Sequence, residues 1–155
     1  MYVDSQELFS DSQAVTATAI STNVLDLNPD LGGLANGIQD IGNGRDVYLV
    51  VQTSVTATDA GSDATLTLTL ESDSTANLAT APVVHYSTGA LAFATYATAG
   101  SVFVAGVVLP NADYKRYLGL RYTIGAGPLT AGAFTAFLTL DVQRYKNYAS
   151  GFTVA

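Results

Sequence analysis

The chain has 155 residues, no cysteine, and 13 acidic against six basic side chains, which gives a formal charge of −7. The lack of cysteine excludes disulfides and thiolate metal sites, and the negative charge argues against nucleic acid as the main partner because it repels phosphate. Charged residues make up only 12% of the chain, so we expect a folded protein and not a disordered one. We interpret residues 1–155 as one domain, with 144–155 as a C-terminal tail.

The N-terminal stretch MYVDSQELFSDS has neither a basic start nor an apolar run. We therefore expect no secretory signal, and a chain that is made in a cytoplasm and used as made. The segment SQELFSDSQAV hints at a single helical turn, and we expect the first strand to follow it at 13–20.

The middle of the chain shows the clearest strand pattern. In ATLTLTLES, Leu66, Leu68 and Leu70 alternate with threonines, which is typical of an antiparallel strand with one buried and one solvated face. The segment DVYLVVQTSV alternates in the same way.

The stretch from Ser87 to Ala112 carries no charge and is nominally long enough to span a membrane. It is rich in threonine, serine and glycine, however, and no lysine or arginine flanks it. We interpret it as two buried strands joined at TAGS, and we expect no membrane partner.

The last third of the chain alternates in two segments joined by the turn-forming sequence GAGPLTAG, which we interpret as a hairpin connection. The first segment, YKRYLGLRYTIG, also holds half of the basic residues. The side chains expected to face inward are Leu118, Leu120, Tyr122 and Ile124, then Phe134, Ala136, Leu138, Leu140 and Val142. The pattern thus predicts that Leu140, like Leu68, lies in the core.

The expected strands cover 13–20, 23–27, 46–55, 64–72, 82–87, 91–97, 102–109, 116–124 and 133–143. Many short strands without crossover helices indicate an all-β fold. We predict an antiparallel jelly roll or β-sandwich of about eight strands with almost no helix.

Residues for catalysis are sparse. His85 is the only histidine, so no histidine metal cluster can form, and no G-x-S-x-G elbow accompanies it. We interpret His85 as a strand residue with a hydrogen-bonded ring. The pairs Asp59/Asp63 and Asp40/Asp46 lie in turns; a surface calcium ion there stays open, although regular ligand spacing is missing. We expect no enzyme activity, no cofactor and no metal.

Two aromatic clusters are candidate interfaces. Tyr117, Arg121 and Phe137 are expected to point outward together, and a patch holding Arg121 and Asp141 could be self-complementary across a two-fold axis. A homodimer is thus favoured over a trimer. The alternative is that Arg121 pairs across strands with an acid such as Asp141, which would not exclude an interface nearby.

The second cluster is in the tail and consists of Tyr145, Tyr148 and Phe152. These side chains either dock on a neighbouring subunit or another protein of an assembly, or pack back on their own sandwich.

Three segments carry a resemblance to a known family. They are MYVDSQELFSDSQAVTATAISTNVLDL, DIGNGRDVYLVVQTSVTATDAGSDATLTLTLESD and RYLGLRYTIGAGPLTAGAFTAFLTLDVQRYKNYASGF. Together they resemble the capsid cement, or decoration, proteins of short-tailed bacteriophages. The resemblance implies a self-associating jelly-roll protein on the outer surface of the virion, which stabilises contacts between major capsid protein subunits. The family has no catalytic residues to carry over.

Two other functions stay open at this stage. A carbohydrate- or receptor-binding β module of a phage tail fibre would use exposed tyrosines to stack on sugars, and the chain has nine tyrosines but no tryptophan. A self-assembling surface-layer or pilus-like subunit would form ordered polymers, but the lack of a secretory signal counts against it.

Overall fold

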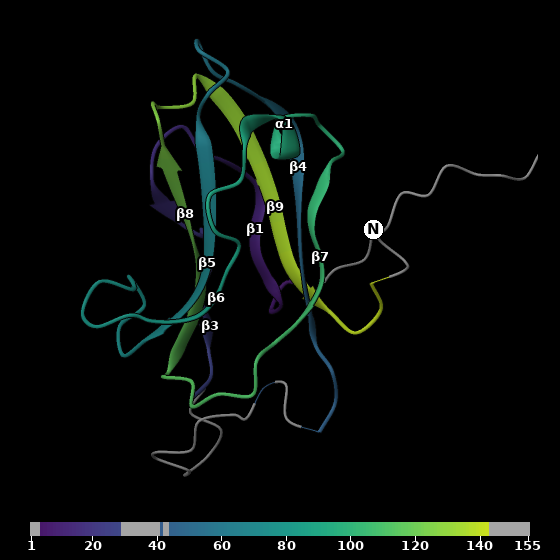
Figure 1. Ribbon diagram of the computed structural model, residues 1–155. Coiled ribbons are helices and arrows are strands. Elements are labelled where there is room, and N and C mark those ends of the chain that lie inside the picture. Colours follow the sequence, from purple (N-terminus) through teal and green to yellow (C-terminus); the bar gives the residue numbers. More distant parts are fainter. Residues whose placement is uncertain (1–3, 29–40, 42–43, 143–155) are drawn as a thin grey trace, which may run out of the picture.

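The computed structural model describes residues 4–28, 41 and 44–142, and these residues form two antiparallel sheets that face each other (Figure 1). The four-stranded sheet has the order β1 (Leu8–Ala14), β9 (Ala131–Thr139), β4 (Tyr48–Thr58) and β7 (Val102–Val108). The other sheet has the order β2 (Ala19–Ile20), β8 (Tyr117–Gly125), β5 (Thr65–Asp73) and β6 (Val83–Ser87), and β3 (Leu25–Asp26) also pairs with β8.

The strand order is that of a jelly roll. Because β2 and β3 both pair with β8, they behave as one interrupted strand. The chain then passes repeatedly from one sheet to the other, with β1, β4, β7 and β9 in the first and the remaining strands in the second. This wrapping pattern is the double Greek key. The prediction of an antiparallel all-β sandwich is therefore confirmed.

The core lies between the sheets and is made by the predicted alternation. Leu66, Leu68 and Leu70 of β5 are at most 1% exposed, and Leu118, Leu120 and Tyr122 of β8 are fully buried. The Tyr122 ring stacks on Phe134 of the opposite sheet with centroids 5.6 Å apart, and its hydroxyl donates to Ser10 Oγ at 3.0 Å. Burial raises the pKa of Tyr122 to about 12, so this phenol stays a hydrogen-bond donor at any physiological pH.

The strand predicted at 91–97 is wrong: this segment contains the short helix α1 (Phe93–Tyr96) at one end of the sandwich (Figure 1). One helical turn lets the Tyr96 side chain enter the core, where it is fully buried and its hydroxyl donates to the carbonyl of Ala64 at 3.0 Å. Within the described residues no helix is long and apolar enough to cross a membrane.

The helical turn expected near the N-terminus is also wrong, because the segment forms β1. Its pairing with β9 shifts register between Leu8 and Ser10 and again between Ser10 and Gln13. Ser12 has a positive φ of 47°, and its amide donates to Thr135 Oγ1 at 3.0 Å. These bulges interrupt the period of two, which is why the sequence pattern did not read as a strand.

The expected hairpin between the last two strands is a crossing between sheets. β8 pairs with β5, β2 and β3, whereas β9 pairs with β1 and β4. Consecutive strands usually pair, and local sequence cannot show that these two do not.

The predicted burial of Leu140 is wrong as well. β9 ends at Thr139, whose Oγ1 accepts the amide of Asp141 at 3.1 Å, and Leu140 is 49% exposed. After Thr139 the chain leaves the strand and turns toward β7. The Val142 methyl groups lie 3.6 and 3.7 Å from the position that a Cβ on Gly106 of β7 would take.

We expect Leu68→Ala and Leu140→Ala to differ strongly in the free energy of unfolding. Removing a fully buried leucine costs about 2–5 kcal/mol, whereas Leu140→Ala should cost less than about 0.5 kcal/mol. Urea unfolding followed by circular dichroism measures both. Equal losses would show that the two side chains are buried alike.

Candidate functional site

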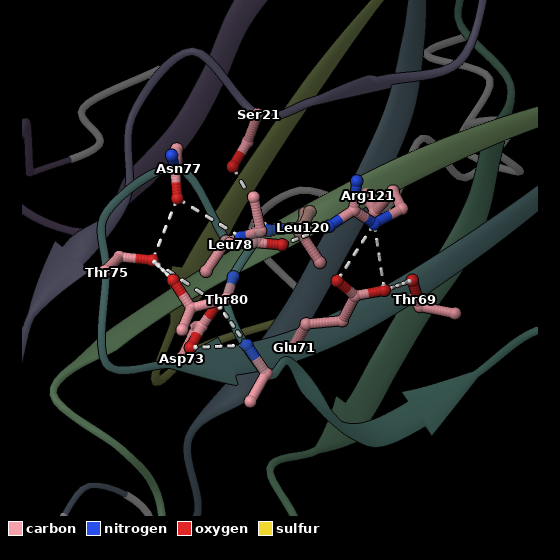
Figure 2. Close-up of polar contacts among 12 residues, drawn as sticks. Ser21, Thr69, Glu71, Asp73, Thr75, Asn77, Leu78, Thr80, Leu120 and Arg121 are labelled. Carbon is pink, nitrogen blue, oxygen red and sulfur yellow. Dashed lines mark hydrogen bonds and ion pairs between the residues drawn. The ribbon is translucent and has the colours of Figure 1, made fainter.

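Part of the outer face of the five-stranded sheet is covered by the segment between β5 and β6, residues 74–81, here called the 74–81 loop (Figure 2). Leu78, in this loop, is fully buried and has a positive φ of 49°. A strained backbone at a buried leucine indicates that its packing outweighs the local conformational cost.

Gly119 of β8 makes room for Leu78. A Cβ at this position would lie 2.8 Å from Val24 Cγ1 and 2.9 Å from Leu78 Cδ1, closer than carbon atoms can approach. A glycine inside an alternating strand is the sequence signal of such a close approach. The glycine in YLGLRY therefore has a packing reason.

Arg121 fastens the loop to the sheet. Its Nε donates to Glu71 Oε2 at 3.0 Å, and its Nη2 donates to the carbonyl of Leu78 at 2.6 Å (Figure 2). Thr69 Oγ1 donates to Glu71 Oε1 at 2.6 Å. The Glu71 side chain is only 6% exposed and that of Arg121 is 27% exposed, so the pair is largely withdrawn from water.

Asp73 holds the two ends of the loop. It is buried, and its carboxylate accepts the amides of Ser74 at 2.6 Å, Thr80 at 2.8 Å and Ala81 at 3.2 Å. Burial acts to raise the pKa of Asp73, but the amide hydrogen bonds outweigh it, so the pKa lies below the usual value of 3.8. The sequence alone did not reveal Glu71, Asp73 and Leu78, because only the fold brings Glu71 and Leu78 to Arg121 and wraps the loop around Asp73.

Arg121 is thus a structural residue that pairs with an acid on the neighbouring strand, as the alternative to an interface predicted, but the acid is Glu71 and not Asp141. The register of β8 beside β5 explains this, since Arg121 is opposite Thr69, one diagonal step from Glu71. The other two basic residues of this segment also have partners within the chain. Arg116 is bidentate on Asp26 at 3.0 and 2.8 Å, and Lys115 Nζ donates to the carbonyl of Ala81.

The expected patch of Tyr117, Arg121 and Phe137 does not form. Phe137 belongs to the other sheet and is fully buried, beside Val50 of β4 and Leu8 of β1. These two apolar cross-strand partners come from other parts of the chain, so alternation along β9 alone cannot reveal them. Tyr117 is half-buried with the Arg116 guanidinium 5.0 Å from its ring centroid. Tyr145, Tyr148 and Phe152 lie outside the described residues.

The rest of this outer face is open and carries small hydroxyl side chains. Thr67 is opposite Thr123, and Thr69 is on the same face as Thr65 and Thr67. Thr123 is exposed and the three β5 threonines are half-buried. We call Thr65, Thr67, Thr69 and Thr123 the threonine face.

Beside it, β6 forms an edge of the sheet. Among the described strands it pairs with β5 alone, and it carries exposed Val83 and Val84. Exposed valines on a strand edge are a favourable place for another chain to add.

His85 is a strand residue of β6 with a hydrogen-bonded ring, as the sequence predicted. Ser72 Oγ accepts the Lys115 amide at 3.0 Å and lies 2.7 Å from His85 Nε2, so its own proton can go to a neutral imidazole. The ring packs on Tyr114 with centroids 4.5 Å apart. Burial lowers the pKa of His85 below 6.5.

The aspartate turns are built by local hydrogen bonds. Asp59 Oδ2 accepts the amides of Ala64 and Asp63, each at 3.0 Å, and these bonds, that of Ala64 most, lower the pKa of Asp59. Asp40 lies outside the described residues. In the part of the chain that the structure describes, no group of three or more histidine or acidic side chains could hold a metal ion.

We expect Arg121→Met to destabilise the protein by about 3 kcal/mol, because it leaves the Glu71 carboxylate buried without its cation. Arg116→Met is the matched control. Its ion pair with Asp26 is 47% and 35% exposed, so its loss should cost less than about 1 kcal/mol. Urea unfolding at neutral pH compares the two; similar losses would contradict the structural role of Arg121.

We expect the protein to lose stability as the pH falls below about 6.5. The unfolded chain then protonates His85 first, because the pKa in the folded protein is lower, and the loss continues down to that folded pKa. The aspartates with lowered pKa contribute to the loss of stability only below about pH 4. His85→Gln keeps an acceptor for Ser72 and should flatten the change in urea midpoint between pH 7.5 and 5.5. An unchanged slope in this variant would exclude His85 as the cause.

Comparison with known proteins gives the family. The model of the family described as Bbp16 matches residues 9–138, from β1 to the end of β9, which indicates a phage-type protein family. The search of curated proteins found no match. Since the family match covers well over half of the 155 residues and includes both sheets, the chain belongs to the Bbp16 family.

Proposed function

We propose that this chain is a structural virion protein, a capsid cement or decoration protein that binds the outside of a phage head. The family match over residues 9–138 is the main support for the proposal, because it indicates a phage-type protein. The resemblance of three segments to the cement proteins of short-tailed phages narrows it to the capsid. The partner is then the major capsid protein, and the protein stabilises contacts between its subunits without catalysis.

The threonine face is the docking surface that we favour. Thr65, Thr67, Thr69 and Thr123 are uncharged and lie on one sheet. Threonine loses less rotamer freedom on burial than lysine or glutamate, so contacts made through it cost little to order. Each contact is modest, but a protein that touches several capsid subunits gains through effective concentration.

We also propose self-association as a homodimer in preference to a trimer. Support from a patch of Arg121 and Asp141 is gone, since Arg121 pairs with Glu71 inside the chain. The edge strand β6 now supports the homodimer. Antiparallel pairing of β6 from two copies across a two-fold axis would cover Val83 and Val84 of both.

The tyrosines weigh against the tail-fibre alternative. Of the six that lie in the described residues, Tyr96, Tyr114 and Tyr122 are buried, and Tyr48, Tyr86 and Tyr117 are half-buried. A sugar-stacking platform needs an open ring face, but Tyr96, Tyr114 and Tyr122 belong to the core and Tyr86 packs against it.

We expect Thr123→Glu to abolish binding to particles assembled from the major capsid protein of the same phage, because it introduces a long charge into the docking face. Thr95→Glu makes the same change on the exposed surface of α1 and should bind like the parent. Co-sedimentation measures binding, and cryo-electron microscopy locates the protein on the head.

The outcomes separate the parts of the proposal. A parent protein that does not bind particles contradicts the cement function itself. Equal binding by both variants contradicts only the choice of face. Light scattering on the parent tests the homodimer, which a monomer or trimer would contradict.

A further inference from the structure

A groove of about 620 Å³ lies on the side of the sandwich away from β6 and β7, between the start of β1 and the segment around β3. Its walls are two short stretches of chain, Ser5–Leu8 and Asn23–Leu27, with Ile41 completing the described lining. The groove is separate from the hydrogen bonds around Arg121. Val24 lines the groove and also packs close to Gly119 of β8.

Hydrogen bonds hold the two walls in place. The Asn23 amide donates to the carbonyl of Phe9 at 2.9 Å, and Asn23 Nδ2 donates to the carbonyl of Leu8 at 3.0 Å. The Leu138 amide donates to the Glu7 carbonyl at 2.9 Å, which anchors the first wall to β9. The Leu27 amide donates to the Arg116 carbonyl at 2.7 Å, which anchors the second wall beside β8. The groove is therefore preformed, so a ligand would not have to order it.

The lining combines apolar side chains with the carboxylate of Glu7, and no basic residue of the described lining pairs with it. Leu8, Val24, Leu25 and Ile41 are half-buried and Leu27 is buried. Asp26 also lines the groove, but Arg116 neutralises it at 2.8 Å. Glu7 is half-buried, and the described lining contains no lysine, arginine or aromatic residue.

The electrostatics of Glu7 also favour a cation in the groove. Its burial, with the negative charge of Asp4 as a second cause, raises the pKa of Glu7 above the usual value of 4.5. A cation brought beside it would relieve both effects.

We propose that this groove is a binding site for an extended segment of a partner protein that carries a lysine or arginine between apolar residues. The cation pairs with Glu7, and the flanking side chains cover the leucines and Val24. A phosphate or other anion is disfavoured by Glu7, and a sugar lacks an aromatic ring to stack on. The site is independent of the capsid function: it requires a basic, apolar segment, whichever protein carries it.

Three peptides test the proposal on the full chain by two-dimensional NMR. The probes are acetyl-Val-Lys-Val-amide and the same peptide with norleucine or glutamate at the centre. We expect the lysine peptide to shift the amide signals of the groove residues Ser5–Leu8 and Asn23–Leu27. The norleucine peptide should bind about tenfold more weakly, and the glutamate peptide should cause no shift.

A pair of variants then isolates the carboxylate. Glu7→Gln should reduce affinity for the lysine peptide about tenfold and make it equal to that for the norleucine peptide. Asp11→Asn removes the same charge from an exposed position of β1 outside the groove and should leave the affinity unchanged. The NMR spectra report folding of both variants directly.

Several results would overturn the proposal. They are no shift with the lysine peptide, equal shifts with all three peptides, shifts confined to other surfaces, or equal affinities of the two variants. Groove signals that move with protein concentration alone would assign the site to a second copy of this chain. None of these measurements involves a capsid, so their failure is distinct from a failure to bind particles.

Discussion

Two apolar strand faces meet across the sandwich, and the position of Tyr122 between them constrains the rest of the structure. Its ring stacks on Phe134, and its hydroxyl reaches Ser10 in the opposite sheet, so β8, β9 and β1 are locked in one arrangement. With the inner face of β8 set, the outer face must carry Gly119 and Arg121. The 74–81 loop, the ion pair and the open threonine face all follow from that orientation.

Three of the six positive charges of this acidic chain serve the fold. The three basic side chains of the segment 114–125 each fasten a piece of chain remote in sequence: Arg116 holds Asp26, Lys115 holds the Ala81 carbonyl, and Arg121 holds Glu71 and Leu78. These three cations are therefore occupied within the chain.

The candidate site could be predicted only in part. The alternation in YKRYLGLRYTIG correctly assigned Arg121 to the outer face, whereas the close approach at Gly119 emerged only from the structure. The partner Glu71 lies 50 residues away along the chain and becomes a neighbour only because β5 pairs with β8. The groove at Glu7 combines two stretches that no local pattern connects.

Strand content, the alternating faces and the buried leucines were determined by the sequence itself, because side chains in a strand point to opposite sides with a period of two. Tertiary structure alone decided which strands pair. It put β8 and β9 in different sheets, ended β9 before Leu140 and made Phe137 a buried residue although it lies opposite to the core-facing positions. The physical reason is that a period of two records only which face a side chain takes. Whether that face is covered depends on neighbours brought from elsewhere in the chain.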